Sequence, residues 1–122
     1  MILSRAPTRI TLGGGGTDLE SYYSKYGGFL IAGAISKYCT ILASPRFYTG
    51  IRLSYSKTEI RNNVSEIEHR IFRAALQLTD INDSIELHST ADVPAGCGLG
   101  TSSSFTAALL NALHAYKRQF IT

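Results

Sequence analysis

Hydrophobic and polar residues alternate along several short stretches of the chain, and this pattern predicts β-strands. The stretches are residues 2–12, 29–36, 38–44, 51–55 and 84–91. Pro7 lies inside the first stretch, so we expect that strand near an edge or a bulge. Residues 29–36 and 38–44 follow each other almost directly, and we predict that they form a hairpin.

Apolar residues spaced three and four apart predict two longer helices. The first covers residues 65–79, with an apolar stripe of Val64, Ile67, Ile71, Ala74, Ala75 and Leu78. Ser65 and Glu68 fit a capping box at its start, and Asn63 is the alternative cap. The second begins at Thr101 or Ser102 and ends near Arg118, with a stripe of Phe105, Ala108, Leu109, Ala112, Leu113 and Tyr116.

A short third helix is predicted over residues 18–26, with Asp18 as its N-cap and Gly27 and Gly28 at its end. Several strands therefore precede a helix, one more strand and a last helix. This order predicts an α+β fold with a mostly antiparallel sheet. A chain of 122 residues is long enough for one such domain and short for two.

Composition narrows the class of protein without identifying a function. Hydrophobic residues make up 44% and charged residues 17%, as in ordinary globular proteins. The net charge is +3 and the basic residues are scattered, so we expect no nucleic-acid partner. No apolar run approaches the roughly 20 residues of a membrane span, and the N-terminus does not resemble a signal peptide. Cys39 and Cys97 read as free thiols, which favours a cytoplasmic protein without membrane partners.

The candidate chemistry is concentrated in the stretch "PAGCGLGTSSS", residues 94–104, between a predicted strand and a predicted helix. Its glycines let successive N–H groups point into one concavity, and the helix brings unpaired N–H groups and positive partial charge. Together these features favour an anion site suited to phosphate. The loop lacks the lysine of a P-loop and the spacing of a dinucleotide fingerprint. A serine-capped glycine turn without a ligand is the alternative.

This stretch resembles the second motif of the GHMP kinases, the group that includes galactokinase, homoserine kinase and mevalonate kinase. Six positions fit the motif, Thr101 replaces its first serine, and Ser103 and Ser104 replace alanines. The resemblance implies that the loop binds ATP and that the Ser102 hydroxyl also helps to coordinate Mg²⁺. The ATP-binding residues would be Pro94, Gly96, Cys97, Gly98, Leu99, Gly100, Thr101, Ser102 and Ser103. A packing role is the alternative for Ser103 and Ser104.

Residues 5–28, "RAPTRITLGGGGTDLESYYSKYGG", resemble the first motif of the same family. The subgroup with the most similar pattern comprises the kinases of D-glycero-D-manno-heptose 7-phosphate. The resemblance implies that Gly16, Thr17 and Asp18 bind the sugar and that Arg9 is catalytic, close to the transferred phosphoryl group. An N-cap role for Asp18 and a surface role for Arg9 are the alternatives.

The resemblance covers the N-terminal part of a GHMP kinase, whose sheet carries its helices on one side. Residues 1–122 are therefore expected to form an incomplete N-terminal domain, without the C-terminal domain that supplies a Mg²⁺-binding Glu, an Asp and a third glycine motif. We expect an ATP-dependent kinase of the anomeric hydroxyl of a heptose 7-phosphate, inactive as this portion alone and prone to self-association through exposed surface. The alternatives are a kinase of another sugar, such as fucose, and a non-catalytic nucleotide- or sugar-phosphate-binding module.

Overall fold

The computed structural model describes residues 1–119 of the chain. This part contains a five-stranded sheet with the strand order β1-β2-β5-β3-β4. The strands are β1 (Ile2–Gly13), β2 (Ile31–Pro45), β3 (Ile51–Ser54), β4 (Thr58–Arg61) and β5 (Ile85–Ala91). The helices are α1 (Glu20–Tyr26), α2 (Arg70–Leu78) and α3 (Thr101–Tyr116), with a single 3-10 turn at Val64–Glu66.

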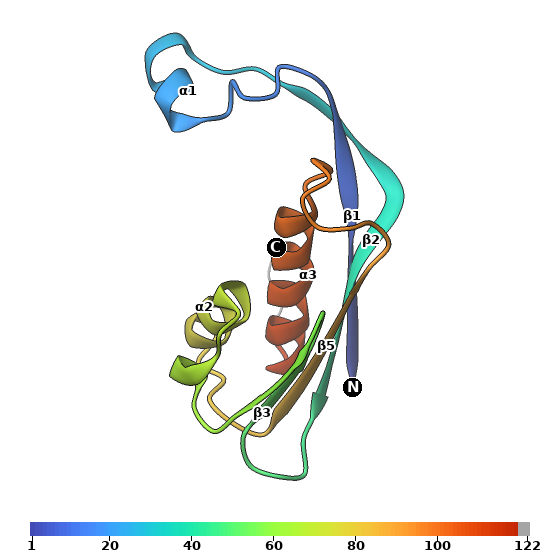
Figure 1. The fold of residues 1–122 in the computed structure, drawn as a ribbon, viewed down its shortest axis with the longest axis vertical. Helices are drawn as coiled ribbons and strands as arrows, with labels where there is room; N and C mark the ends of the chain where they lie inside the picture. Colours follow the sequence, from blue (N-terminus) through green and yellow to red (C-terminus); the bar gives the residue numbers. More distant parts are fainter. Residues whose placement is uncertain (120–122) are drawn as a thin grey trace.

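Helices α2 and α3 cover one face of the sheet, and the core lies between them and the strands (Figure 1). The sheet contributes alternate residues of β2, β3 and β5 to this core: Ile41, Ala43, Ile51, Leu53, Ile85 and Leu87. The helices contribute Phe72, Ala75, Leu76, Ala108, Leu109, Ala112 and Leu113. Of the strand pairings in the described part, only β3 with β5 is parallel. The predicted α+β class, mostly antiparallel sheet and one-sided helix packing are confirmed.

The predicted hairpin over residues 29–44 is wrong, because β2 is one continuous strand. Its residues 31–43 run along β1, and its residues 39–45 pair with β5. The register with β1 shifts between Pro7 and Arg9, which is the bulge that Pro7 led us to expect. The buried Thr8 hydroxyl donates to the carbonyl of Lys37 at 3.0 Å and stabilises this irregularity. Residues 36–37 therefore form part of a bulged strand rather than a turn.

The predicted helix over residues 65–79 begins too early, because α2 starts only at Arg70. The N–H of Glu68 donates to the Glu59 carboxylate at 2.9 Å, and the Glu68 carboxylate pairs with Lys57 and Arg61. These bonds hold the chain extended before the helix, so neither Ser65 nor Asn63 caps it. His69 is the N-cap instead. The buried stripe consequently contains Phe72 and Leu76, whereas Ala74 and Leu78 are exposed.

Strand β4 was not predicted, because its polarity is opposite to that of a normal half-buried strand. Glu59 is 3% exposed, whereas the neighbouring Ile60 is 53% exposed. A charged residue in the core position and an apolar one in solvent conceal the alternation on which the prediction depends. Other strand boundaries and the start of α3 at Thr101 agree with the sequence pattern to within a few residues.

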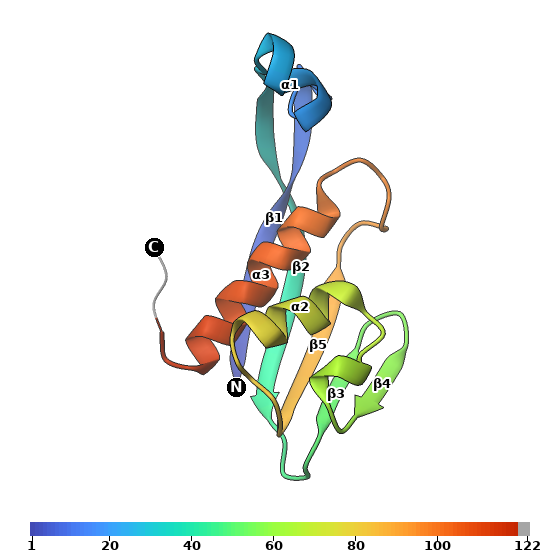
Figure 2. The same cartoon turned by 90° about the vertical axis from the view of Figure 1, so that its left-hand side faces the viewer.

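Strands β1 and β2 continue beyond the rest of the sheet as a two-stranded ribbon, and α1 lies at its far end (Figure 2). Gly27 ends α1 as predicted, in the left-handed region with φ of 71°. Asp18 does not cap this helix, because the N-cap position belongs to Leu19 and no side chain caps it. No residue of α1 is buried. None of the helices described in residues 1–119 is long and apolar enough to cross a membrane.

Candidate functional site

The loop between β5 and α3 is anchored at both of its ends. Asp92 exchanges two hydrogen bonds with the backbone of Tyr38, one through its N–H and one through its carboxylate, each of 2.9 Å. At the other end the carbonyl of Leu99 accepts from the N–H of Arg9 at 3.0 Å. The loop is therefore hydrogen-bonded to β2 at one end and to β1 at the other. The backbone bond between Arg9 and Leu99 joins the two sequence motifs.

Three glycines give this loop a shape that other residues adopt only with strain. Gly96, Gly98 and Gly100 have φ values of 78°, 77° and 68°, all in the left-handed region. The first N–H of α3 with a backbone partner belongs to Ser104, which donates to Gly100. Among the described residues, no carbonyl accepts from the N–H groups of residues 96–103. A row of free N–H groups at a helix N-terminus can bind an anion such as phosphate.

Arg9 packs directly on the start of α3. A side-chain carbon added to Gly100 would lie 3.1 Å from Cγ and 3.2 Å from Nε of Arg9. The Arg9 guanidinium donates to the Thr11 hydroxyl at 2.7 Å, which fixes its direction. The structure thus brings the predicted catalytic arginine and the predicted ATP loop together, and the positive charge of Arg9 lies beside Gly100. The catalytic role itself stays a prediction.

The hydroxyl residues of the motif divide into distinct environments. Ser102 and Ser103 are exposed, and Ser102 lines the cavity described below. Ser104 is 8% exposed, and its hydroxyl donates to the Pro7 carbonyl at 2.7 Å. A packing role therefore suits Ser104 and not Ser103. Thr101 contacts both cysteines, through its carbonyl to Cys39 Sγ at 3.5 Å and through its hydroxyl to Cys97 Sγ at 3.7 Å.

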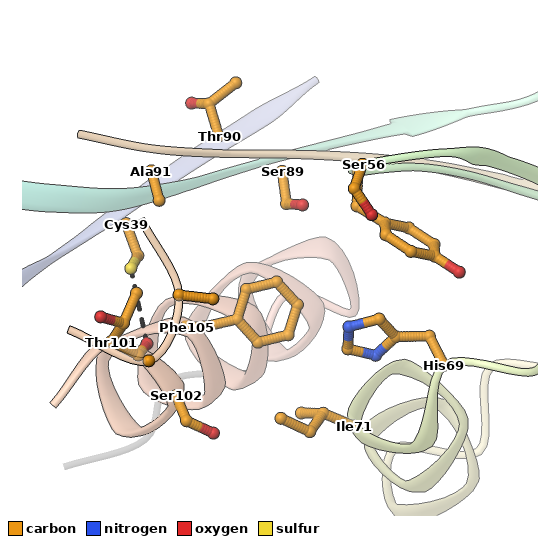
Figure 3. A pocket seen from close by; sticks show the side chains of 13 residues that line it. Cys39, Ser56, His69, Ile71, Ser89, Thr90, Ala91, Thr101, Ser102 and Phe105 are labelled. Carbon is orange, nitrogen blue, oxygen red and sulfur yellow. Dashed lines mark hydrogen bonds between the residues drawn. The ribbon is translucent and has the colours of Figure 1, made fainter. Parts of the chain in front are cut away.

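A cavity of about 480 Å³ opens beside the loop (Figure 3). Its loop end is formed by Ala95, Gly96, Thr101 and Ser102, and its other walls come from β2, β5, the end of β3, the start of α2 and the first turns of α3. The residues of these walls are Cys39, Tyr55, Ser56, His69, Ile71, Ser89, Thr90, Ala91 and Phe105. Sequence reasoning missed Tyr55, His69 and Phe105 as site residues, because they come from separate elements and share no spacing.

The aromatic wall of the cavity is one connected cluster. The His69 ring centroid lies 4.8 Å from that of Tyr55, 4.9 Å from that of Phe72 and 5.5 Å from that of Phe105. Burial lowers the pKa of His69 below its ordinary value, and the charge of Glu59 opposes this change. The ring is therefore neutral at physiological pH.

The buried Glu59 carboxylate holds the residues of this aromatic wall in place. Its carboxylate accepts hydrogen bonds from the Tyr55 hydroxyl and from the N–H of Glu68. Burial alone raises the pKa of Glu59, but these bonds and the positive charge of Lys57 bring it below its ordinary value. Burial and the bond to Glu59 raise the pKa of Tyr55, so its phenol keeps its proton. A buried, ionised carboxylate thus holds the end of β3 and the start of α2 together.

Two of the three predicted sugar-binding residues line a second, separate cavity of about 480 Å³ at the tip of the ribbon, and Gly16 does not line it. Thr17 and Asp18 line it, and it shares no residue with the first cavity. The Thr17 hydroxyl accepts from the N–H of Phe29 at 3.1 Å and lies 2.7 Å and 2.9 Å from the carbonyls of Gly14 and Phe29. Thr17 therefore joins the glycine turn to β2 and has little capacity left for a ligand.

Asp18 is exposed, and its carboxylate accepts from the N–H of Gly16 at 3.1 Å. Its other oxygen has no partner among the described residues, so it can accept from a hydroxyl group. Figure 1 shows the ribbon bending so that α1 lies on the helix-covered side of the sheet, beyond the N-terminus of α3. Within residues 1–119 no group of three or more His, Cys, Asp or Glu side chains could hold a metal ion.

Comparison with known proteins gives consistent results. Residues 69–121 match the family described as the GHMP kinases N terminal domain. A D-glycero-alpha-D-manno-heptose 7-phosphate kinase of Campylobacter jejuni is 32% identical over 127 residues, covering 91% of this chain and 36% of that protein. A crystal structure of a D-glycero-D-manno-heptose 1-phosphate kinase from Bacteroides thetaiotaomicron superposes with a TM-score of 0.85 at 24% identity, over 97% of this chain and 42% of that one.

A crystal structure of mevalonate kinase superposes with a TM-score of 0.79 at 19% identity, over 100% of this chain and 42% of that one. At these identities the two structures establish the shared fold alone. The chain spans less than half the length of each of these relatives. Residues 69–121 thus match the family model of the GHMP kinases N terminal domain, and the chain has the fold of that domain.

Proposed function

We propose that this chain is the nucleotide-binding, N-terminal part of an ATP-dependent sugar kinase. The observation that carries the proposal is the row of free N–H groups at residues 96–103, opening directly into a cavity with aromatic walls. A phosphate chain fits the first feature and a nucleobase fits the second. The cavity volume lies within the range of about 300–1,000 Å³ that is common for small-molecule sites.

The residues present fit both ATP and Mg²⁺ at the loop. The free N–H groups and Arg9 would neutralise phosphate oxygens, and the exposed Ser102 hydroxyl would provide one oxygen ligand for Mg²⁺. A bound Mg²⁺ would supply positive charge against the negative charge that develops on the phosphates. Arg9 would stabilise the same charge from the other side of the loop, since it already lies against Gly100. A base and further Mg²⁺ ligands would come from outside residues 1–119, in a C-terminal domain that we propose completes the site.

Heptose 7-phosphate is the acceptor that we propose, with phosphoryl transfer to its anomeric hydroxyl. The support is the 32% identical relative that phosphorylates this class of sugar, together with the exposed carboxylate of Asp18. A carboxylate accepts paired hydrogen bonds from neighbouring sugar hydroxyls. Asp18 would therefore orient the sugar at the ribbon tip, while the loop holds the nucleotide on the body of the domain.

Isothermal titration with Mg·ATP tests the nucleotide half of the proposal. Ser102→Ala removes the proposed Mg²⁺ ligand and should weaken Mg·ATP binding roughly tenfold, the worth of one good hydrogen bond or ligand contact. Ser65→Ala is the matched control, because Ser65 is also exposed and lies outside the cavity. Equal loss in both variants, or no binding of Mg·ATP to the unmodified protein, would refute the nucleotide site.

The acceptor half is tested by a kinase assay on the full-length protein with heptose 7-phosphate, fucose and galactose. Asp18→Ala should raise the sugar concentration needed for half-maximal activity. It should leave ATP affinity nearly unchanged, because Asp18 lies in the separate tip cavity. Turnover with fucose alone would favour a fucokinase. A lack of ATP turnover with every sugar, combined with intact ATP binding, would favour the non-catalytic binding module.

A further inference from the structure

One polar ring projects into the aromatic cavity. His69 lies at the start of α2, and the free edge of its ring points toward Phe105 and the cavity (Figure 3). Its Nδ1 accepts from the N–H of Phe72 at 3.4 Å, which caps the helix. A nitrogen that accepts a hydrogen bond carries no proton, so the proton of the neutral ring lies on Nε2. The helix cap therefore determines which tautomer faces the cavity.

The ring is also held in direction. Tyr55 and Phe72 pack on it edge to face, with interplanar angles of 73° and 64°. Tyr55 is itself held by its hydrogen bond to Glu59, whose other oxygen accepts from the backbone N–H of Glu68, the residue before His69. Rotation of the imidazole would break the cap and disturb these contacts. The Nε2–H group is thus a donor of fixed direction, which is how specificity groups in ligand sites are built.

We propose that His69 is a specificity-determining residue that donates a hydrogen bond from Nε2–H to a ring nitrogen of the purine bound in this cavity. The inference rests on the proposed function, since it requires the cavity to hold the nucleobase. Phe105 and Tyr55 would contact the apolar surface of the base, and His69 would supply the directional bond. A base without an acceptor nitrogen at that position would leave Nε2–H unpaired and bind less well.

The arrangement also couples nucleotide binding to pH. Protonation of His69 places a hydrogen on Nδ1, which then opposes the N–H of Phe72 and breaks the cap. The ionisable groups that face the ring or the cavity are the Glu59 carboxylate, the Tyr55 phenol and the Cys39 thiol. Lys57 and Arg61 pair with the neighbouring Glu68, and Arg61 also with Glu59. Within residues 1–119, Glu59 is the charged group that acts on the ring, and it favours protonation of His69.

Titration of the protein with ATP and with 1-deaza-, 3-deaza- and 7-deaza-ATP tests the assignment. Each analogue replaces one ring nitrogen by C–H, so one of the three should bind roughly tenfold more weakly than ATP. His69→Asn removes the Nε2 donor and keeps a side-chain oxygen that caps a helix well. This variant should bind ATP and the sensitive analogue equally, whereas His114→Asn, far along α3, should keep the discrimination.

Four results overturn the inference, and they differ in what else they affect. Equal binding of all analogues to the unmodified protein, or discrimination that survives in His69→Asn, removes the role of His69 and leaves the nucleotide site intact. Inorganic triphosphate that binds as tightly as ATP shows that the loop holds phosphate while the cavity holds no base. Absence of ATP binding to the unmodified protein refutes both the inference and the proposed function.

Discussion

The two halves of the candidate site lie on regions of very different construction. The body of the domain, formed by the sheet with α2 and α3, buries a continuous core of aliphatic and aromatic side chains. The ribbon tip, residues 13–30, has no buried residue, and its large apolar side chains are mostly in solvent, among them Leu19, Tyr26 and Phe29. The nucleotide loop belongs to the body, and Asp18 belongs to the tip.

The two regions are therefore stabilised by different interactions. The body is held by hydrophobic burial, which is large and distributed over many residues. The tip is held by a few local hydrogen bonds, such as those of Thr17, and by glycines that allow close backbone contact. Regions with little buried surface open at a small free-energy cost. Nucleotide binding should therefore be robust to changes in the tip, whereas the proposed sugar site should not be.

The largest expected effect is on global stability, and it contrasts a body leucine with a tip leucine. Leu109 is fully buried in α3, so Leu109→Ala should lower the free energy of unfolding by about 2–5 kcal/mol. Leu19 is 62% exposed, and Leu19→Ala should change it by less than about 0.5 kcal/mol. Urea unfolding followed by circular dichroism measures both. Similar losses in the two variants would show that the tip shares the core.

A smaller effect is expected at the N-terminus of α3. Gly98 and Gly100 both have positive φ, so alanine at either should cost about 1–2 kcal/mol of backbone strain. Only at Gly100 would the new methyl group contact Arg9, at 3.1 Å, whereas nothing lies within 4 Å at Gly98. Gly100→Ala should therefore weaken ATP binding more than Gly98→Ala. The reverse order in a titration would argue against a role for Arg9 at the loop.

The pH dependence of stability should arise in the body and in two steps. The pKa of His69 is lowered on folding, so the unfolded chain takes up the proton first and stability falls as pH drops below about 6.5. The pKa of Glu59 is also lowered, so its contribution is complete above about 4.5 and is lost in more acidic solution. Urea unfolding between about pH 8 and about pH 2 measures the two steps. His69→Asn should remove the upper step only.

The smallest global effect is expected in the tip, although the local change is severe. A methyl group on Gly14 would lie 2.0 Å from the carbonyl oxygen of Phe29, so Gly14→Ala must distort the turn. Gly15→Ala is the matched control, because its methyl group would meet only the Thr11 side chain at 3.5 Å. Hydrogen exchange over residues 13–30 should accelerate in Gly14→Ala alone. An equal fall in thermal stability of the whole body would contradict the separation of the two regions.

The sequence predicted those parts of the structure in which the hydrophobic pattern and the burial agree. The strands Ile2–Gly13 and Ile85–Ala91 and the helix Thr101–Tyr116 were found in this way. Burial of Glu59 reversed the pattern in β4 and, through its bond to Glu68, also displaced the start of α2. One buried carboxylate therefore accounts for both errors. Side-chain polarity alone cannot reveal a charge whose partners come from other elements.

The candidate site likewise has one part that the sequence could predict and one part that it could not. The glycine loop is contiguous, so its proposed role as an anion site could be predicted from residues 94–104 alone. The contact of Arg9 with Gly100 joins positions far apart in the chain, and only the family resemblance suggested that they meet. Tyr55, His69 and Phe105 come together only in the folded domain, and no motif marks them. Sequence reasoning thus found the proposed phosphate site and missed the aromatic cavity beside it.

The length of the ribbon formed by β1 and β2 determines how far Asp18 lies from the body of the domain. Each strand residue advances about 3.3 Å, and a change of one residue turns every later side chain to the opposite face. Adding a pair of residues to both strands would therefore move Asp18 outward by about 6.6 Å without changing the side on which it lies. If ATP binds at the body, the length of this ribbon sets the gap that an acceptor must span, and so selects substrates by size before any hydroxyl is recognised.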